Sequence, residues 1–408
     1  MKRFAIIIYT IMLTTFLYGQ HMVYGNSIHT LQVCLNGNPL LPPVLTLGKS
    51  SQLNISWDEM SHDYHRYIYR IQHCTWDWQE NQELFESDFL QGTNDMPVED
   101  YETSFNTTQI YTHYSLDFPN QDATVLLSGN YKLLVFEDGY IENGPVIEVR
   151  FYVAESGMRL TTQVSANTDI DFNDKHQQVS MSLSYGTTKV TNPNSQIQAV
   201  VIQNSRTSRT VSGVRPNIIK GDGLEWQHRE ELIFPAGNEY HKFEILNVSQ
   251  SGMNVDHMRW FDPYYHATLW TDQVPASYIS NKDHNGAFIP RTEDQDNNNT
   301  QAEYVVVHFA LSSPPLDQDV YINGKWSNGE LDSNCLMHYN EELKLYEATL
   351  LLKQGYYEYS YITSDGSTLN TMGDFWQTEN EYQTFIYYRE TGGRYDRLIA
   401  YSRVNTGF

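Results

Sequence analysis

The residues that could carry out catalysis are numerous, but they do not form the patterns of known catalytic motifs. The sequence has no Gly-x-Ser-x-Gly nucleophile turn, no Gly-x-x-x-x-Gly-Lys-Ser/Thr phosphate loop and no His-Glu-x-x-His zinc motif. Its 50 Asp and Glu residues offer so many carboxylate pairs of the kind that hydrolyse glycosides that no single pair stands out. The sequence therefore predicts no catalytic residues, and a protein that is not an enzyme.

The best candidate for a metal site lacks residues that such a site needs. Residues 169–174 follow the spacing of a calcium loop, but Asp174 stands where a glycine is required and Ser180 where a glutamate would bind the ion. His62 and His65 are three residues apart, so on a strand they would point to opposite faces. We expect no metal and no cofactor.

The three cysteines leave two arrangements open. Cys34 and Cys74 both fall in predicted strands of the first domain and could form a disulfide in an oxidising compartment. They could equally remain two buried thiols. Cys335 is left over in either case.

Arginine and tyrosine gather near the end of the chain. Residues 389–403 contain four arginines and two acidic residues, in a chain whose net charge is −24. Because Arg and Tyr are enriched at binding hot spots, we predict that this end contributes to a protein interface. The alternative is a final hairpin whose aromatic residues belong to the core. The residues predicted to contact a partner are Tyr388, Arg389, Arg394, Tyr395 and Arg397.

The elements that would position these residues are short strands. Residues 28–35, 67–74 and 146–153 are rich in β-branched or aromatic residues and are bounded by turn sequences. Long amphipathic helical windows are missing, which excludes folds that need helical crossovers between parallel strands. The prediction is an all-β protein of tandem antiparallel β-sandwiches, immunoglobulin-like or fibronectin-like. Its net charge of −24 argues against nucleic acid and anionic membrane surfaces as partners.

The chain begins with a pattern typical of an export signal. Lys2 and Arg3 precede an apolar run at residues 4–17, followed by Gly19 and Gln20. The run is too short to span a membrane as a helix, which needs about 20 residues. We expect cleavage after Gly19 and export to the periplasm. An outer-membrane barrel is the alternative, and the weak apolar alternation of the last residues argues against it.

Composition divides the chain into four parts. Residues 1–25 are the signal peptide and leader, and residues 26–155 make a first sandwich of normal size. Residues 156–300 are predicted to form a second β-rich domain that ends in an acidic, Asn-rich linker, and residues 301–408 a third sandwich.

Short stretches in the first and last domains stand out together: Ile71-Gln-His-Cys74, Thr75-Trp-Asp-Trp78, Ser104-Phe-Asn-Thr107, Tyr111-Thr-His-Tyr114, Ser128-Gly-Asn-Tyr131, Val320-Tyr-Ile-Asn-Gly324, Leu352-Lys-Gln-Gly-Tyr-Tyr357, Thr378-Glu-Asn-Glu-Tyr382 and Arg394-Tyr-Asp-Arg-Leu398. In this order they resemble one family, the plug protein of the type IX secretion system of Bacteroidota. The resemblance implies a periplasmic, non-enzymatic subunit that docks on the periplasmic mouth of the outer-membrane translocon barrel and seals its pore when no substrate is engaged. It implies no catalytic residues, and no partner-contacting residue can be matched by motif.

The third sandwich is also similar to the early set of immunoglobulin-like domains, which includes glycogen-binding modules. Those modules stack a tryptophan on glucose beside an asparagine, and here Trp326 and Asn328 match only part of that pattern. A periplasmic carbohydrate-binding protein is therefore the alternative function.

Overall fold

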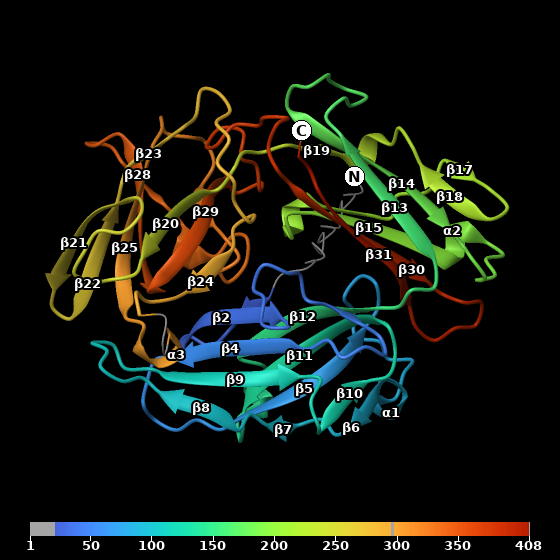
Figure 1. The fold of residues 1–408 in the computed structure, drawn as a ribbon, viewed down its shortest axis with the longest axis horizontal. Helices are drawn as coiled ribbons and strands as arrows, with labels where there is room; N and C mark the ends of the chain where they lie inside the picture. Colours follow the sequence, from blue (N-terminus) through green and yellow to red (C-terminus); the bar gives the residue numbers. More distant parts are fainter. Residues whose placement is uncertain (1–20, 295–297, 408) are drawn as a thin grey trace, which may run out of the picture.

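The computed structural model describes residues 21–294 and 298–407 and confirms the all-β prediction. The strands form three β-sandwiches that lie around a common centre, with unit 1 at the bottom of Figure 1, unit 2 at the upper right and unit 3 at the upper left. Residues 1–20 of the predicted leader, with the cleavage site between Gly19 and Gln20, lie outside the described residues. Residues 21–25 of that leader belong to the first unit instead, because Met22 and Val23 form a short strand that pairs with Glu148 and Ile147.

Unit 1 comprises residues 21–155 and two main sheets. The first sheet has the order β1-β12-β11-β5-β7, with β3 also paired to β12; these strands are Met22–Val23, Ile147–Ala154, Gly129–Glu137, Tyr67–Cys74, Met96–Pro97 and, for β3, Val44–Thr46. The second has the order β2-β4-β9-β8, which are Ile28–Leu35, Leu53–Glu59, Thr112–Phe118 and Asp100–Thr103. Smaller elements are β6 (Leu90–Gly92), β10 (Ala123–Val125), α1 (Glu86–Phe89) and η1 (Ile141–Asn143).

Strand β12 shows how unit 1 is attached to the rest of the molecule. All eight of its residues are buried, whereas a strand with one solvated face would alternate. Val149 and Phe151 point into the core of unit 1. Tyr152 and Ala154 point the other way, into an apolar cluster shared with unit 2. Both faces of β12 are therefore covered by protein.

Unit 2 is built from two separate parts of the chain. One sheet has the order β13-β14-β18-β17, with β19 paired to β14; these strands are Arg159–Ser165, His176–Ser184, Gly223–Trp226, Ile218–Ile219 and, for β19, Ile233–Pro235. The other has the order β16-β15-β30-β31, which are Thr210–Ser212, Ile197–Gln203, Glu381–Tyr388 and Arg397–Asn405. The helices are α2 (Pro193–Gln196), η2 (Thr207–Arg209) and η3 (Glu230–Leu232).

In the sequence, the strands of unit 3 fall between the two parts of the chain that form unit 2. One sheet centres on β29 (Gly355–Thr363), which pairs with β20 (His241–Ile245), β24 (Phe288–Pro290) and β26 (Val320–Asn323). The other has the order β21-β22-β25-β28-β27, with β23 paired to β25; these strands are Val255–Phe261, Tyr264–Leu269, Tyr304–Ser312, Leu345–Lys353, His338–Asn340 and, for β23, Asp272–Gln273. The helices are α3 (Asn298–Gln301) and η4 (Ser333–Cys335).

The sheets therefore divide the chain differently from the predicted boundary between residues 300 and 301. Strands β20 and β24 precede that boundary but pair with β29, and β30 follows it but pairs with β15. The expected linker is held within unit 3, because the amide of Arg291 donates to the carbonyl of Gln354 at 3.1 Å and that of Glu293 to Leu246 at 3.1 Å. The polar residues 291–294 are partly or fully exposed on unit 3, so their composition reflects a surface position rather than a break between domains.

Candidate functional site

The predicted partner-binding residues lie where the β30–β31 hairpin meets unit 1. Arg397 donates two hydrogen bonds to the carboxylate of Glu155, at 2.7 and 2.8 Å, and the hydroxyl of Ser128 donates to the same carboxylate at 2.8 Å. The hydrogen bonds to Glu155 raise the pKa of Arg397. Burial alone would raise the pKa of Glu155, but Arg397 and Ser128 outweigh it and hold that pKa below its usual value.

The loop between β30 and β31 is fastened to the α1 region of unit 1. Arg389 forms an ion pair with Glu83 at 2.9 Å, and Arg394 forms one with Asp88 at 2.9 Å. The ring of Tyr395 packs edge-on against a histidine of β5, with 5.7 Å between the ring centroids. Charges of opposite sign from the two units therefore face each other across this junction.

Tyr388 has a different position from the other four residues. Its side chain is buried in the core of unit 2, and its hydroxyl donates to the carbonyl of Lys189 at 3.1 Å. Arg389, Arg394, Tyr395 and Arg397 contact unit 1, so the structure gives these residues a role within the chain. Contact of this group with a partner protein stays a prediction.

Apolar packing completes the junction of units 1 and 2. The rings of Tyr152 and Phe385 stack at 4.2 Å between centroids, and the hydroxyl of Tyr387 donates to the side-chain oxygen of Asn130 at 2.7 Å. The only sequence signal for this contact is the end of β12, residues 151–154, where Phe, Tyr, Val and Ala make both faces of the strand apolar. The other buried members of the cluster are Val44, Cys74, Trp78, Ala154, Val200, Ile202 and Leu398.

A buried ion pair joins units 1 and 3. The ammonium of Lys353 lies 2.7 Å from Asp58, and the two side chains are 1% and 0% exposed. Tyr304 donates to the same carboxylate at 2.7 Å, and His113 Nδ1 lies 2.7 Å from its other oxygen. The Lys353 ammonium also sits 4.2 Å from the ring centroid of Tyr111. Burial alone would raise the pKa of Asp58, but Lys353 and His113 together hold that pKa below its usual value.

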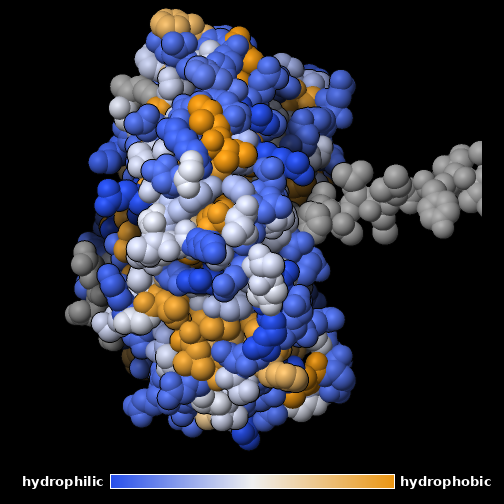
Figure 2. All heavy atoms as spheres, turned by 90° about the vertical axis from the view of Figure 1, so that its right-hand side faces the viewer, coloured by the Kyte–Doolittle hydropathy of each residue, from blue (hydrophilic) through white to orange (hydrophobic). Residues whose placement is uncertain are grey.

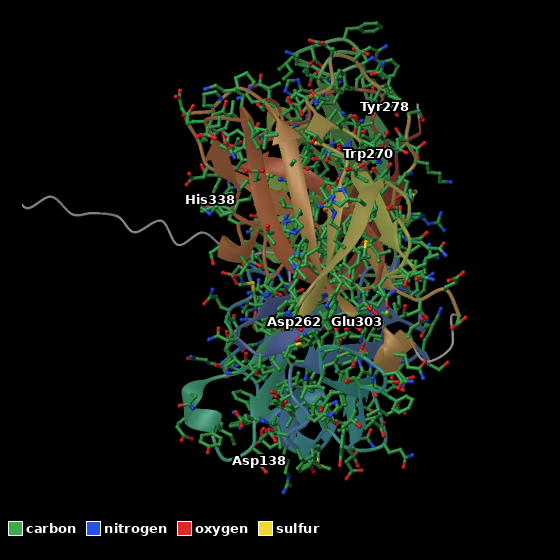
Figure 3. All side chains as sticks on the ribbon, turned by 90° about the vertical axis from the view of Figure 1, so that its left-hand side faces the viewer. Asp138, Asp262, Trp270, Tyr278, Glu303 and His338 are labelled. Carbon is green, nitrogen blue, oxygen red and sulfur yellow. The ribbon has the colours of Figure 1, made fainter. Side chains whose placement is uncertain are left out.

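A second contact of the same two units uses Glu303, which Figure 3 shows near their border. Its carboxylate accepts hydrogen bonds from the amide and the hydroxyl of Thr108, both at 2.8 Å, and from the amide of Gln109 at 3.2 Å. Tyr111 donates to the carbonyl of Ala302 at 2.9 Å. These hydrogen bonds hold residues 108–111 of unit 1 against the residues that directly precede β25.

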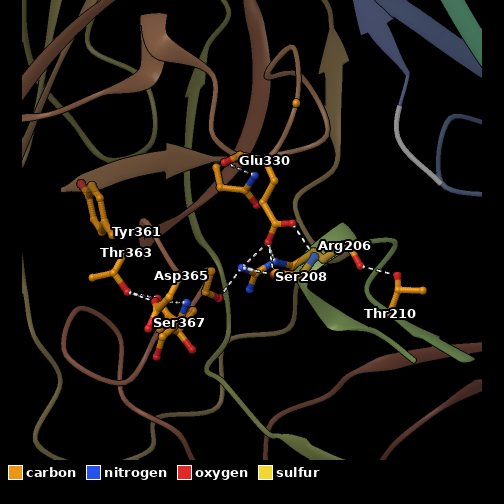
Figure 4. A network of polar contacts seen from close by, with 12 residues as sticks. Arg206, Ser208, Thr210, Glu330, Tyr361, Thr363, Asp365 and Ser367 are labelled. Carbon is orange, nitrogen blue, oxygen red and sulfur yellow. Dashed lines mark hydrogen bonds and ion pairs between the residues drawn. The ribbon is translucent and has the colours of Figure 1, made fainter. Parts of the chain in front are cut away.

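Units 2 and 3 are joined by the network in Figure 4. Arg206 donates from Nε to Glu330 at 2.8 Å and from Nη2 to the carbonyl of Gly366 at 2.8 Å, while the amide of Ser208 donates to Glu330 at 2.8 Å. The side chains of Arg206 and Glu330 are each 7% exposed. Burial would raise the pKa of Glu330, but the charge of Arg206 outweighs it and lowers that pKa.

The comparisons with known proteins agree with this three-unit arrangement. A family profile described as "Type 9 secretion system plug protein 1st domain" matches residues 28–155. A solved structure, described as that of a hypothetical protein from Parabacteroides merdae, is 35% identical, with a TM-score of 0.91 over 95% of this chain and 99% of that chain. The chain belongs to the type IX secretion system plug protein family. No curated protein matches it.

The plug-family match coincides with unit 1, and the likeness to the solved structure extends over all three units. Within the described residues of this plug-family chain, no helix has the length and apolar character needed to cross a membrane. No group of three or more His, Cys, Asp or Glu side chains is arranged to hold a metal ion in the same part of the chain. Cys34, Cys74 and Cys335 are free thiols, so the optional disulfide does not form.

The tryptophan considered for sugar binding is engaged within unit 3. The indole nitrogen of Trp326 donates to the carbonyl of Glu358 at 2.9 Å. Its ring packs against Phe309 and Tyr357, with centroids 6.4 and 5.9 Å away. A ring used in this way is not an open platform for a sugar.

A group of buried acids lies close to the connection from unit 2 to unit 3. Asp283 accepts hydrogen bonds from the amides of Tyr240 and Asn285. Burial, helped by the negative charges of Glu358 and Glu239, raises the pKa of Asp283 to about 8. Folding therefore favours the protonated form of this carboxyl.

Proposed function

We propose that this chain is a non-enzymatic plug subunit of the type IX secretion translocon. It docks on the periplasmic mouth of the outer-membrane barrel and seals the pore while no substrate is engaged. The export pattern at residues 1–19 and the family membership support a periplasmic location.

The observation that carries the proposal is the joining of three sandwiches by buried contacts at every junction. Units 1 and 3 share the ion pair of Asp58 and Lys353, and units 2 and 3 share that of Arg206 and Glu330. Units 1 and 2 share the apolar cluster around Tyr152. Domains of one chain usually move relative to each other unless their interface is extensive. A body that closes a wide opening must resist such movement, and these contacts supply the resistance without a cofactor.

The outer surface fits a partner that is bound and released. Figure 2 shows units 2 and 1 from the side, with hydrophilic residues over most of the face and hydrophobic residues in a few separate groups. Interfaces that form and dissociate are about as polar as the rest of a protein surface. We therefore expect docking by mixed polar and aromatic contacts rather than by one large apolar face.

The test compares the permeability of the outer membrane in four strains. Deleting the gene should admit large fluorescent dextrans or antibiotics when the translocon barrel is present, and should change nothing when the barrel is also deleted. Re-expression of the chain should restore the seal. Equal permeability of the plug deletion and the parent strain would overturn the proposal.

A further inference from the structure

A cleft of about 500 Å³ lies between units 1 and 3. From unit 1 it is lined by consecutive residues of β2, Ile28 to Thr30, and from unit 3 by consecutive residues of β28, Thr349 to Leu352. Successive side chains of a strand point to opposite faces. A cavity that touches every residue of such a run therefore meets the edge of the strand, where the main-chain groups are.

The hydrogen-bond register shows which main-chain groups of β28 face the cleft. The amide of Gln354 donates to the carbonyl of Glu303 at 2.8 Å, which makes these two residues a hydrogen-bonded pair. Bonded pairs alternate along an antiparallel ladder, so Leu352 and Leu350 also bond to β25. The amides and carbonyls of Thr349 and Leu351 point away from it.

This outer edge of β28 is covered in part by β27 and is flanked by η4, whose residues Asn334 and Cys335 also line the cleft. Strand β27 pairs with residues 345–347 and ends there. Among the residues that the structure describes, no hydrogen bond is found for the main-chain groups of Thr349 and Leu351. On the opposite wall, β2 is the last strand of its own sheet, and its pairing with β4 is irregular between His29 and Gln32. Two strand edges thus border one cleft.

The lining favours an extended chain with alternating side chains. Nine of the lining residues are Val, Ile, Leu, Phe, Tyr or Trp, and Asp332 is the only Asp, Glu, Lys or Arg among them. A smaller hollow of about 110 Å³, with a mainly apolar lining, adjoins the cleft and shares Val23, Phe288, Trp326, Ser327 and Asn328 with it. The apolar and aromatic lining residues that could receive alternate side chains are Val23, Ile28, Phe288, Trp326, Leu350, Leu352 and Tyr357.

We propose that an extended segment of a partner polypeptide binds in this cleft and adds a strand to the free edge of β28. Main-chain hydrogen bonds to Thr349 and Leu351 supply affinity, and apolar side chains at every second position enter the cleft. The four residues of β28 that line the cleft, Thr349 to Leu352, correspond to about 13 Å of strand at about 3.3 Å per residue. Because Asp332 is the single acid of the lining and the chain carries a net charge of −24, the segment is neutral or basic. The proposal does not depend on the plug function.

The test uses the exported chain and a displayed library of random octapeptides. Selection should enrich neutral or basic sequences with apolar residues at alternate positions. The Kd of a selected peptide should rise at least tenfold more with Leu351→Pro than with Leu351→Ala. Both variants lose the leucine side chain of residue 351, but only proline also lacks the backbone N–H. The difference between their Kd values therefore measures the hydrogen bond that this N–H donates to the peptide. Bound peptide should also slow hydrogen exchange at the amides of Thr349 and Leu351 in the unsubstituted chain, which keeps the test valid if the proline variant does not fold.

Three results would overturn the proposal. One is a selection that enriches no such sequences. Another is equal binding by the proline and alanine variants, combined with unchanged exchange at the two amides. The third is slow exchange at Thr349 and Leu351 without any peptide, which would mean that a segment of this chain already covers the edge.

Discussion

Replacing Lys353 by methionine should destabilise the protein strongly, because it leaves the Asp58 carboxylate buried without its counter-charge. Removing one partner of a buried ion pair typically costs about 3–5 kcal/mol. Asp58 keeps its hydrogen bonds to Tyr304 and His113, so we expect a loss near the lower figure, about 3 kcal/mol. We expect the loss as a lower free energy of unfolding, measured by urea titration with tryptophan fluorescence as the signal.

A matched control and a double variant separate this cause from others. Lys344 pairs with Glu341 on the surface, with side chains 69% and 76% exposed, so Lys344→Met should change stability by less than about 0.5 kcal/mol. Adding Asp58→Asn to Lys353→Met removes the unpaired charge and should recover part of the loss. If Lys353→Met costs no more than Lys344→Met, the reasoning is wrong.

The same pair predicts the response to acid. The pKa of Asp58 is lowered in the folded protein, so its stabilising effect is present above its unfolded value of about 3.9 and is lost as the pH falls through the folded value. Between neutral pH and acid pH, the free energy of unfolding of Asp58→Asn should therefore fall less than that of the unsubstituted chain. A parallel decline of both proteins below pH 4 would contradict this.

Three further changes test the junction of units 1 and 2 and the buried acid. Phe385→Ala should lower the free energy of unfolding by about 3–5 kcal/mol, whereas Ala at the exposed Phe172 should leave it nearly unchanged. Arg397→Glu should cost about 1–3 kcal/mol, and adding Glu155→Arg should restore part of this; no recovery would show that the charges do not act as a pair. Since the pKa of Asp283 rises from 3.8 to about 8 on folding, stability should fall as the pH rises between these values. Asp283→Asn, which resembles the protonated acid, should then be more stable than the parent by more than about 1 kcal/mol above pH 8 and equal to it near pH 4.

The strands of unit 1 could be predicted because their residues are patterned locally. The β-branched and aromatic run at residues 28–35 and the run at 67–74 coincide with β2 and β5. The neighbours of β30 could not be predicted in the same way. Its pairing with β15 joins residues that are far apart in sequence, and no local pattern specifies such a partner. From composition alone, the acidic stretch before residue 300 therefore predicts a linker between domains.

The candidate site illustrates a similar limit. Arginine pairs with a carboxylate in the same geometry whether the acid belongs to a partner or to another unit of the same chain. The composition of residues 389–403 predicted an interface, and the structure shows Arg397 in one, with Glu155. Asp58 and Lys353 gave no signal at all, because an ion pair between distant residues has no spacing to detect. Their meeting depends on how units 1 and 3 pack.

The insertion of unit 3 into unit 2 has a consequence for biogenesis. Strand β15 is synthesised early, but its neighbour β30 is made only after the whole of unit 3. Until then Val200 and Ile202 lack the part of their apolar cluster that Phe385 and Tyr387 of β30 supply, and β15 has an open edge that can pair with other chains. We expect newly synthesised molecules to need a holding chaperone during this interval. A nonsense mutation just before β30 should yield aggregates, even though it spares two complete sandwiches.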